Sequence, residues 1–514
     1  MLSNYLRLYN TVKFLKFEQI AYRLYYFSRN RIRTALGENY KFSKSAKVQT
    51  LKLQKSIHIR DVYLGKKKFE FLNLNKKFDS AIDWNFDKHG KLWTYNLTYF
   101  DYLSQSRDKD ELLELIYSFI ESIPNMKDGL EPFPISLRGM NWIKFLSYNH
   151  IRNQKIDDSL YAQYHILLDN LEYHLLGNHL LENAFSLLFG AYYFEDETFY
   201  LKSKKILNKE LNIQILRDGA HFELTPMYHQ IMLFRLLDCI NLLKNNRWQN
   251  DDLLDFLIEK SELMLGWLEH ISYENGDIPL LNDSTNGIAP HSLDLYAYAK
   301  RLNLTSRKIL LSESGYRKIK KNSYEMILDV GEIGAKFIPG HAHADTLNFE
   351  LRVKGRPFIV DVGLSTYETS QRRVLERSTK SHNTVECLGM NQSDVWGGFR
   401  VANRASIVKL DEKENYISAI HNGYKKLGCL HTRTWKFYNN RIIIEDNLSR
   451  RIKSISRLHF HPSVTKEDIY KYLLFDVENS SIKQYHYSPE FNTHLDAFVL
   501  EIEFEKEVNI EILI

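Results

Sequence analysis

The sequence predicts an α+β protein of two large domains, a helical domain followed by an antiparallel β-sandwich. Apolar residues recur at three- and four-residue spacing from about residue 90 to 310, which is typical of amphipathic helices. From about residue 320 onward, short β-branched segments are bounded by Gly, Asn and Asp. The 514 residues also exceed what one core usually fills. We therefore expect a basic, mostly helical N-terminal segment at 1–85, a helical domain at 86–315 and a sandwich at 316–514.

The N-terminal segment is strongly basic and rich in aromatic side chains. Residues 1–60 hold thirteen Lys and Arg against Glu18 and Glu38. A basic amphipathic helix of this kind can lie on an anionic membrane surface. The alternative is a solvated helix that packs its aromatic stripe on the next domain. Peripheral contact with the inner membrane through this segment is thus one of two interpretations.

Several features favour a cytoplasmic location. The first twenty residues contain no continuous apolar region and no small-residue cleavage site, so we expect no signal peptide. No stretch approaches the roughly 20 apolar residues of a membrane span. Three cysteines, odd in number and far apart, suggest no disulfide framework and favour a reducing compartment.

The helical domain is expected to consist of repeated helical hairpins. Segments such as SLYAQYHILLDNLEYHLL and YHQIMLFRLLDCINLLKNN are of similar length and are separated by short polar links. Such repetition is typical of an α-solenoid or of a closed toroid of helical hairpins. In the second domain, LRVKGRPFIV and WKFYNNRIIIE predict tight-turned hairpins, and many short strands of this type favour an antiparallel sandwich.

Composition narrows the class of partner. The net charge of +5 is mild for this length and argues against a dedicated nucleic-acid binder, but it would tolerate an acidic polymer. Aromatic residues reach 13% of the chain, and aromatic rings often line carbohydrate clefts, although they fill cores equally well.

A histidine cluster follows the start of the second domain. His341, His343, Asp361 and His382 lie within about forty residues, each near a strand-like run. On a strand, His-x-His would point both rings to the same face. An Asp and a His from later strands could then complete a zinc site. The alternative is a set of surface histidines in a sheet.

Polar side chains also gather at the predicted starts of three helices in the first domain. They are Arg138, Asn141 and Trp142 at the first, Asn178, His179 and Glu182 at the second, and Tyr228 at the third. Helix N-termini favour anions, so this pattern suggests an anion-receiving cleft at one end of the domain. The structural alternative is that Asn178 caps its helix and Glu182 completes the capping interaction.

Six motifs together give a specific resemblance. SLRGMNW, GNHLLEN, DGAHFELTPMYH, GHAHADTLNFEL, PFIVDVG and SHNTVE occur in this order. With them, the chain resembles the heparinase II/III family of polysaccharide lyases, which includes heparin, heparan-sulfate and alginate-oligomer lyases. The resemblance extends from about Trp93 to the C-terminus. It implies an incomplete (α/α) toroid followed by an antiparallel β-sandwich.

The resemblance implies β-elimination at a 4-O-linked uronic acid. Asn178 matches the residue that neutralises the substrate carboxylate, and His179 matches the adjacent catalytic histidine. Tyr228 matches the tyrosine that protonates the leaving O4 and, for one substrate epimer, also takes the C5 proton. His341 matches a histidine that acts from the sandwich as base or as carboxylate partner.

The resemblance also implies a metal and a substrate clamp. His343, Asp361 and His382 match zinc ligands whose role is structural. Arg138 matches a weaker position, a clamp for a substrate carboxylate. Glu182 corresponds to an acidic position of the heparinase II branch, and Asn141 and Trp142 are expected to contact substrate beside Arg138.

Three functions follow from these features. The first is a lyase for uronate-containing glycans in bacterial cell-surface polysaccharide metabolism, because the missing signal peptide argues against a secreted catabolic enzyme. The second is a glycan-binding or assembly protein of a capsule or O-antigen pathway that keeps the fold without turnover. The third is a zinc hydrolase that uses His343, Asp361 and His382 to activate water. The sequence leaves the particular uronate, the cleavage mode and the oligomeric state open.

Overall fold

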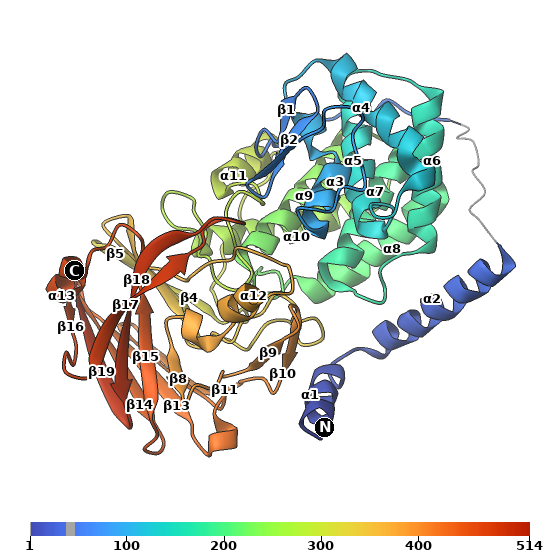
Figure 1. Cartoon of the computed structure of the whole chain (residues 1–514). Helices are drawn as coiled ribbons and strands as arrows, with labels where there is room; N and C mark the ends of the chain where they lie inside the picture. The colour runs from blue at the N-terminus through green and yellow to red at the C-terminus, as the bar shows by residue number, and fades with distance from the viewer. Residues whose placement is uncertain (1, 38–46) are drawn as a thin grey trace.

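The computed structural model describes residues 2–37 and 47–514. Part of the predicted N-terminal segment, 38–46 with Glu38, lies outside the described residues. Figure 1 shows the N-terminal helices, a helical domain and a β-rich C-terminal domain in chain order.

The N-terminal segment is helical only in its first part. α1 (Leu2–Val12) and α2 (Phe17–Leu36) are followed by extended chain and by a small antiparallel sheet of β1 (Tyr63–Gly65), β2 (Lys68–Phe71) and β3 (Leu74–Lys77). Phe69 and Phe71 are buried while Lys68 and Glu70 are half-exposed, which is the period of a strand rather than of a helix. The prediction of a mostly helical segment is therefore wrong for its second half.

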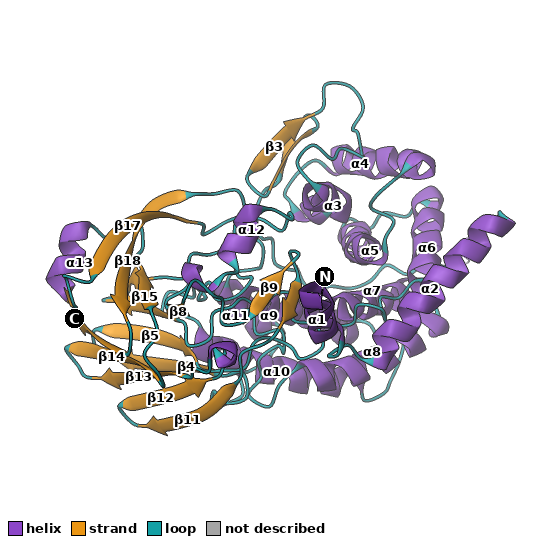
Figure 2. Cartoon of the chain, turned by 60° about the horizontal axis from the view of Figure 1, so that its bottom comes forward, coloured by secondary structure: helices purple, strands orange, loops and turns teal. Residues whose placement is uncertain are grey.

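α2 packs on the helical domain through one face. Figure 2 shows it beside the helices of that domain. The Gln19 Nε2 and Tyr26 Oη atoms donate to the Leu175 and Leu171 carbonyls, at 3.0 and 2.5 Å. Tyr22 stacks on Tyr173, with ring centroids 4.6 Å apart. Among the described residues, no helix combines the length and the apolar character that crossing a bilayer requires.

The helical domain has two layers. Its elements are α3 (Lys91–Tyr99), η1 (Asp101–Ser104), α4 (Lys109–Ser122), α5 (Pro132–Tyr148), α6 (Gln154–Asp169), α7 (Gly177–Phe194), α8 (Glu197–Gln214), α9 (Pro226–Asn245), α10 (Leu253–Ile271) and α11 (Ser292–Arg301). α7 contacts both α5 and α9 in the inner layer, and each of these three helices pairs with its successor in the outer layer. Every residue of α7 except His179 is buried, because this helix is packed from all sides.

The second domain consists of stacked antiparallel sheets. Its strands are β4 (Tyr316–Lys321), β5 (Tyr324–Asp329), β6 (Phe349–Val353), β7 (Arg356–Ile359), β8 (Val385–Cys387), β9 (Asp394–Trp396), β10 (Arg400–Ala402), β11 (Ile407–Lys413), β12 (Tyr416–His421), β13 (His431–Phe437), β14 (Arg441–Leu448), β15 (Ser454–His459), β16 (Leu473–Leu474), β17 (Ser480–Tyr487), β18 (Leu495–Phe504) and β19 (Glu507–Leu513). They form sheets in the orders β4-β5-β6-β7, β11-β12-β13-β14-β19-β16 and β17-β18-β15-β8. The two predicted hairpins are confirmed as β6–β7 and β13–β14. Short helices α12 (Gln371–Glu376) and α13 (Lys466–Tyr472) lie between strands.

A buried loop between α10 and α11 brings the two domains together. Residues 280–285 of this loop are all buried. The Asp283 backbone N–H donates to the His341 carbonyl at 3.1 Å, and the Asn286 N–H donates to the Pro489 carbonyl at 2.8 Å. The loop is thereby fixed against two segments of the second domain, next to the predicted histidine cluster.

Candidate active site

The start of α7 places Asn178 against a buried carboxylate. Gly177 has φ +59°, and a Cβ there would lie 2.8 Å from the Glu223 Oε1 atom, so only glycine fits without a shift. The Asn178 backbone N–H donates to Glu223 Oε1 at 3.0 Å, and its Nδ2 donates to both Glu223 oxygens at 3.0 and 2.9 Å. The N-cap is Leu176 and has no side-chain cap, so the interpretation of Asn178 as a capping residue is wrong.

His179, the residue after Asn178, has a partly exposed side chain at the start of α7. Its Nδ1 lies 3.0 Å from the Glu172 Oε1 atom, and its ring packs on Phe133 at a centroid distance of 4.8 Å. Burial opposes the charged form of His179, but the Glu172 carboxylate outweighs it and raises the pKa of the imidazole. His179 can therefore present a positive charge while 35% of its side chain stays exposed.

The start of α9 places Tyr228 against His341 of the second domain. The two rings lie 4.1 Å apart between centroids, and the Tyr367 hydroxyl donates to the Tyr228 oxygen at 3.3 Å. Burial raises the pKa of Tyr228 above its ordinary value, and Arg373 only partly offsets this effect. Tyr228 is therefore a neutral phenol near pH 7, which is the form that can donate a proton.

Asp283 joins several of the predicted residues through one buried carboxylate. Its Oδ2 lies 2.9 Å from His341 Nδ1, and its Oδ1 lies 2.8 Å from His343 Nε2. The Arg373 guanidinium binds both Asp283 oxygens, with Nη2 at 2.6 Å from Oδ2. Burial alone would raise the pKa of Asp283, but Arg373 and the two histidines outweigh it and hold this pKa well below the usual range. Asp283 thus orients His341 with the Nε2 atom toward Glu223, 3.5 Å away.

The predicted metal ligands lie behind this cluster and are fully buried. The segment with His341 and His343 is irregular chain before β6 rather than a strand, so the geometric basis of the His-x-His prediction is wrong. His382 Nδ1 lies 2.8 Å from Asp361 Oδ2, and the His343 and His382 rings are 5.2 Å apart between centroids. Within residues 2–37 and 47–514, no three His, Cys, Asp or Glu side chains are arranged to hold a metal ion. Two buried ring nitrogens, His343 Nδ1 and His382 Nε2, nevertheless have no hydrogen-bond partner, so these two atoms are available to bind a metal ion.

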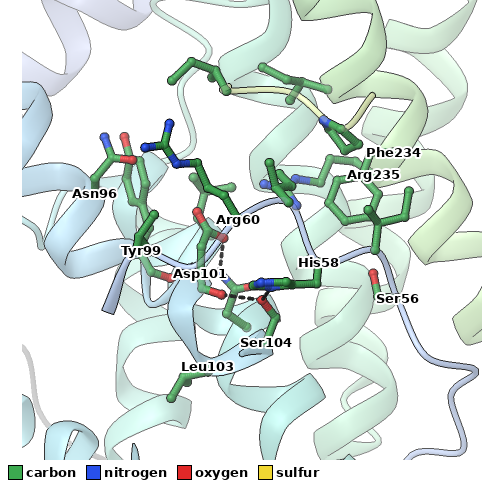
Figure 3. A pocket seen from close by; sticks show the side chains of 18 of the residues that line it. Ser56, His58, Arg60, Asn96, Tyr99, Asp101, Leu103, Ser104, Phe234 and Arg235 are labelled. Carbon is green, nitrogen blue, oxygen red and sulfur yellow. Dashed lines mark hydrogen bonds between the residues drawn. The ribbon is translucent and has the colours of Figure 1, made fainter. Parts of the chain in front are cut away.

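A cavity of about 650 Å³ opens beside the cluster on the helical domain. Of the predicted residues, Asn141, Asn178, Glu182 and Tyr228 line it. Figure 3 shows part of its lining, to which Asn96, Tyr99 and Asp101 of the helical domain and Ser56, His58 and Arg60 of the N-terminal segment contribute. Its volume is in the range of pockets that bind small ligands.

Glu182 and Asn141 are held by polar partners on the cavity wall. Glu182 accepts from the Arg235 Nε atom, at 3.1 Å to Oε1, so it forms a buried ion pair and does not cap α7. The Asn141 Nδ2 atom donates to the Asp101 Oδ1 atom at 2.6 Å.

Arg138 and Trp142 lie in the core and not on the cavity wall. The Arg138 guanidinium is fully buried and donates to Gln163 Oε1 at 2.7 Å and to the Thr98 carbonyl at 2.9 Å. Burial lowers its pKa to about 9. Trp142 packs edge-on against Phe100 at 5.4 Å. These positions contradict the predicted clamp role of Arg138 and the predicted substrate contact of Trp142. The two residues are one turn apart on α5, and both side chains point into the core.

The sequence analysis missed the acidic residues that hold the site together. Glu223 lies inside the motif DGAHFELTPMYH, and Asp283 ends the segment IPLLND. Glu172 and Arg373 lie far from both in sequence. An acidic residue just after an apolar run was a usable sequence signal for Asp283. Arg373 lies in the highly charged segment QRRVLER, where no sequence signal distinguishes it from its neighbours.

The fold and these residues define a protein with a helical toroid, a β-sandwich and a polar cluster where they meet. The model of the heparinase II/III N-terminus matches residues 146–302, and that of the heparinase II/III-like C-terminal region matches residues 304–498. The chain belongs to the heparinase II/III-like family.

Named relatives agree with this assignment. A heparin-sulfate lyase of Bacteroides stercoris is 25% identical over 355 residues, which cover 62% of this chain and 51% of that protein. A heparin-sulfate lyase of Pedobacter heparinus is 26% identical over 254 residues, covering 43% and 38%. The chain thus spans about half or less of the length of these relatives.

Solved structures confirm the predicted fold class of toroid and sandwich. The crystal structure of heparinase III has a TM-score of 0.66 at 16% identity, with 95% of this chain and 89% of that chain covered. The heparan sulfate lyase HepC from Pedobacter heparinus has a TM-score of 0.55 at 16% identity, with 94% and 86% covered.

Proposed function

We propose that this protein is a polysaccharide lyase that cleaves a uronate-containing glycan by β-elimination. One observation carries the proposal: Asn178, Tyr228 and His341 come from two domains and meet at one site. Asn178 and His341 both face Glu223, at 2.9 and 3.5 Å from its Oε2 atom, and Tyr228 packs on the His341 ring. The related heparin-sulfate lyases, by their names, act on a uronate-containing polysaccharide.

The chemistry of these side chains fits the reaction. The C5 proton of a uronic acid is weakly acidic while the neighbouring carboxylate carries a full charge, so donors on that carboxylate stabilise the enolate-like intermediate. In our proposal, Asn178 and the cationic His179 supply these donors. His341, whose Nδ1–H is held by Asp283, takes the C5 proton at Nε2. The C4–O4 bond breaks, a C4=C5 double bond forms, and Tyr228 protonates the departing O4.

The direct test is to incubate the protein with heparan-sulfate, alginate and other uronate glycans. The new C=C bond is conjugated to the carboxylate, so ultraviolet absorbance should rise with at least one acidic glycan. A carboxyl-reduced sample of the same glycan should remain silent. If all acidic glycans stay silent and one of them binds, the protein is a glycan-binding member of the family instead.

We also propose a structural zinc ion on His343, Asp361 and His382. The fully buried position of all three side chains leaves no room for a substrate, which disfavours the zinc-hydrolase alternative. A bound zinc would satisfy the two unpartnered ring nitrogens and stabilise the segments that carry His341 and His382.

His382→Ala should abolish bound zinc and lower the Tm. Removing one of three ligands weakens the site, and metal binding contributes directly to folding. Zinc content measured by mass spectrometry should fall from about one ion per chain to none. The half-buried His461, which contacts Ser463 at 2.8 Å, provides the control, since His461→Ala should retain zinc. A wild-type protein purified without zinc and insensitive to chelators would refute this site.

For the N-terminal segment, we propose peripheral contact with the cytoplasmic face of an anionic membrane. The face of α2 that points away from the helical domain exposes Phe17, Leu24 and Phe27 by 83%, 63% and 56%. Among the described side chains of residues 5–37, the exposed charged ones are cations, namely Lys13, Arg23 and Arg31. Three buried free cysteines support a reducing compartment.

The double substitution Phe17→Asp and Leu24→Asp should weaken binding to vesicles by at least about tenfold, because two apolar anchors of roughly 1.5–3 kcal/mol each are lost. Flotation with phosphatidylglycerol vesicles measures the bound fraction, and phosphatidylcholine vesicles should bind little. Leu310→Asp changes an equally exposed leucine outside α2 and serves as the control. Equal binding to both lipids would contradict the proposal.

A further inference from the structure

Residues 51–62, which we call the strap, cross the helical domain and form one wall of the cavity. Asparagine side chains at the C-terminal end of α9 accept hydrogen bonds from its backbone N–H groups and donate to its backbone carbonyls. The Lys52 N–H donates to Asn246 Oδ1 at 2.9 Å, and Asn246 Nδ2 donates to the Lys52 carbonyl at 2.8 Å. Asn241 makes the same pair of bonds with Gln54, at 2.9 and 2.8 Å. The strap is thus held in register along the C-terminal half of α9.

The strap is also bound at the other end of the cavity. The Ser56 hydroxyl donates to Asp238 Oδ1 at 2.7 Å. His58 Nδ1 lies 3.0 Å from the Ser104 hydroxyl, and the Val62 N–H donates to Gln105 Oε1 at 3.1 Å. These contacts tie the strap to α9 on one side and to η1 and its following loop on the other. A segment held at both ends can present its side chains to the cavity in a defined position.

Arg60 of the strap lines the cavity, and its guanidinium makes only long contacts with neighbouring polar groups. Its guanidinium lies 3.3 Å from Asn73 Oδ1, 3.7 Å from Glu70 Oε1 and 3.8 Å from Glu490 Oε2. Of the three other cavity-lining cations, Lys144 and Arg235 are already bound by buried carboxylates, at 2.6 and 3.1 Å, and Lys55 of the strap is exposed. The Arg60 side chain is 31% exposed. It can therefore exchange its distant carboxylates for a closer anion.

The position of Arg60 connects it to the proposed catalytic residues. The Arg60 Nη1 atom is 3.0 Å from where a Cβ of Gly287 would lie, and Glu490 is next to Phe491 in sequence. The Phe491 ring lies 5.2 Å from the Tyr367 ring, and Tyr367 donates to Tyr228. Arg60, Phe491, Tyr367 and Tyr228 all line the same cavity. A short oligosaccharide in this cavity can therefore contact both Arg60 and Tyr228.

We propose that the strap forms an anion subsite, in which Arg60 binds a carboxylate or sulfate on a sugar neighbouring the cleaved linkage. This inference rests on the proposed lyase function and names a feature of its substrate: a second anionic group on the oligosaccharide within the cavity. A guanidinium suits this role because its planar donors bind carboxylate and sulfate oxygens in pairs. A subsite contributed by the N-terminal segment makes the strap a specificity determinant.

Binding to a catalytically silent protein tests the subsite separately from turnover. In a Tyr228→Phe background, the Kd for an unsulfated glucuronate-containing tetrasaccharide is measured by calorimetry. Adding Arg60→Ala should raise this Kd by about 10- to 100-fold, the loss expected for hydrogen bonds to a charged group. Arg60→Lys should recover part of the affinity, because the charge remains but the paired geometry is lost.

Two further ligands and one control variant make the result specific. The carboxyl-reduced tetrasaccharide should bind equally to the proteins with and without Arg60, and a sulfated tetrasaccharide shows whether sulfate can replace carboxylate. Arg107→Ala is the matched control, since the Arg107 guanidinium contacts the Tyr63 carbonyl at 3.1 Å and does not line the cavity. Its Kd should stay within about twofold of the parent value.

Three outcomes would overturn the subsite: an unchanged Kd for both acidic oligosaccharides in Arg60→Ala, an equal loss for acidic and reduced oligosaccharides, or no binding to the parent protein. Arg60-dependent binding without any double-bond formation by the wild type would support the subsite and refute the lyase function. The two proposals are therefore separable.

Discussion

Replacing Tyr228 with Phe should lower the rate of double-bond formation by about 10²- to 10⁴-fold, the usual contribution of a positioned acid–base group. The substitution removes the hydroxyl that we propose protonates O4 and keeps the ring that packs on His341. Ultraviolet absorbance at saturating glycan gives kcat, and the Tm should change little. KM should also change little, because the hydroxyl acts mainly in the transition state.

Tyr367→Phe is the informative comparison for this prediction. Its hydroxyl donates to Tyr228 at 3.3 Å, so its loss should reduce kcat only modestly, by about tenfold or less. Activity that survives in Tyr228→Phe and disappears on chelation would instead favour the zinc-hydrolase alternative.

Replacing Asp283 with Ala should be the most damaging single change to stability at the site. Arg373 would remain buried without its carboxylate, and removing one partner of a buried ion pair typically costs about 3–5 kcal/mol. His341 and His343 would also lose the acceptor that orients them. We expect the free energy of unfolding, measured in urea, to fall by this amount, and turnover to fall with it.

An exposed ion pair provides the control for Asp283. Glu445 contacts Lys436, and both side chains are partly exposed, so Glu445→Ala should cost less than about 1 kcal/mol. Asp283→Asn keeps the shape and one acceptor oxygen, and should therefore be less destabilising than Asp283→Ala. Equal unfolding curves for Asp283→Ala and the wild type would show that the carboxylate does not hold the cluster.

The periodicity of the sequence was sufficient to predict most of the fold. The three- and four-residue spacing predicted the helical layers, and Lys354-Gly355 between two apolar runs predicted the β6–β7 hairpin. Helix was wrongly expected across the second half of the N-terminal segment, where Phe69 and Phe71 follow a strand period. The strap is neither helix nor strand, and its backbone is held by the side-chain amides of Asn241 and Asn246 at the C-terminal end of α9. Such contacts leave no local pattern.

Predictions for the site divide in the same way. The motifs led to Asn178, Tyr228 and His341, which the structure places together, while their catalytic roles remain proposals. Arg138 stood in an equally suggestive motif, yet its side chain is buried in the core. Position in a motif identifies residue types, but the direction of a side chain depends on which face of the helix is packed.

The sequence by itself determined the two-domain order, the family and the residue types of the site. Only the tertiary structure decided which of those residues face one cavity, and which acids hold them. Asp283, Glu223 and Arg373 are distant in sequence from the groups that they orient, and burial makes each of these contacts strong because a buried charge must be paired. Hydrophobic period is a local property that can be read along the chain, whereas the pairing of buried charges is decided by the packing of segments far apart in it.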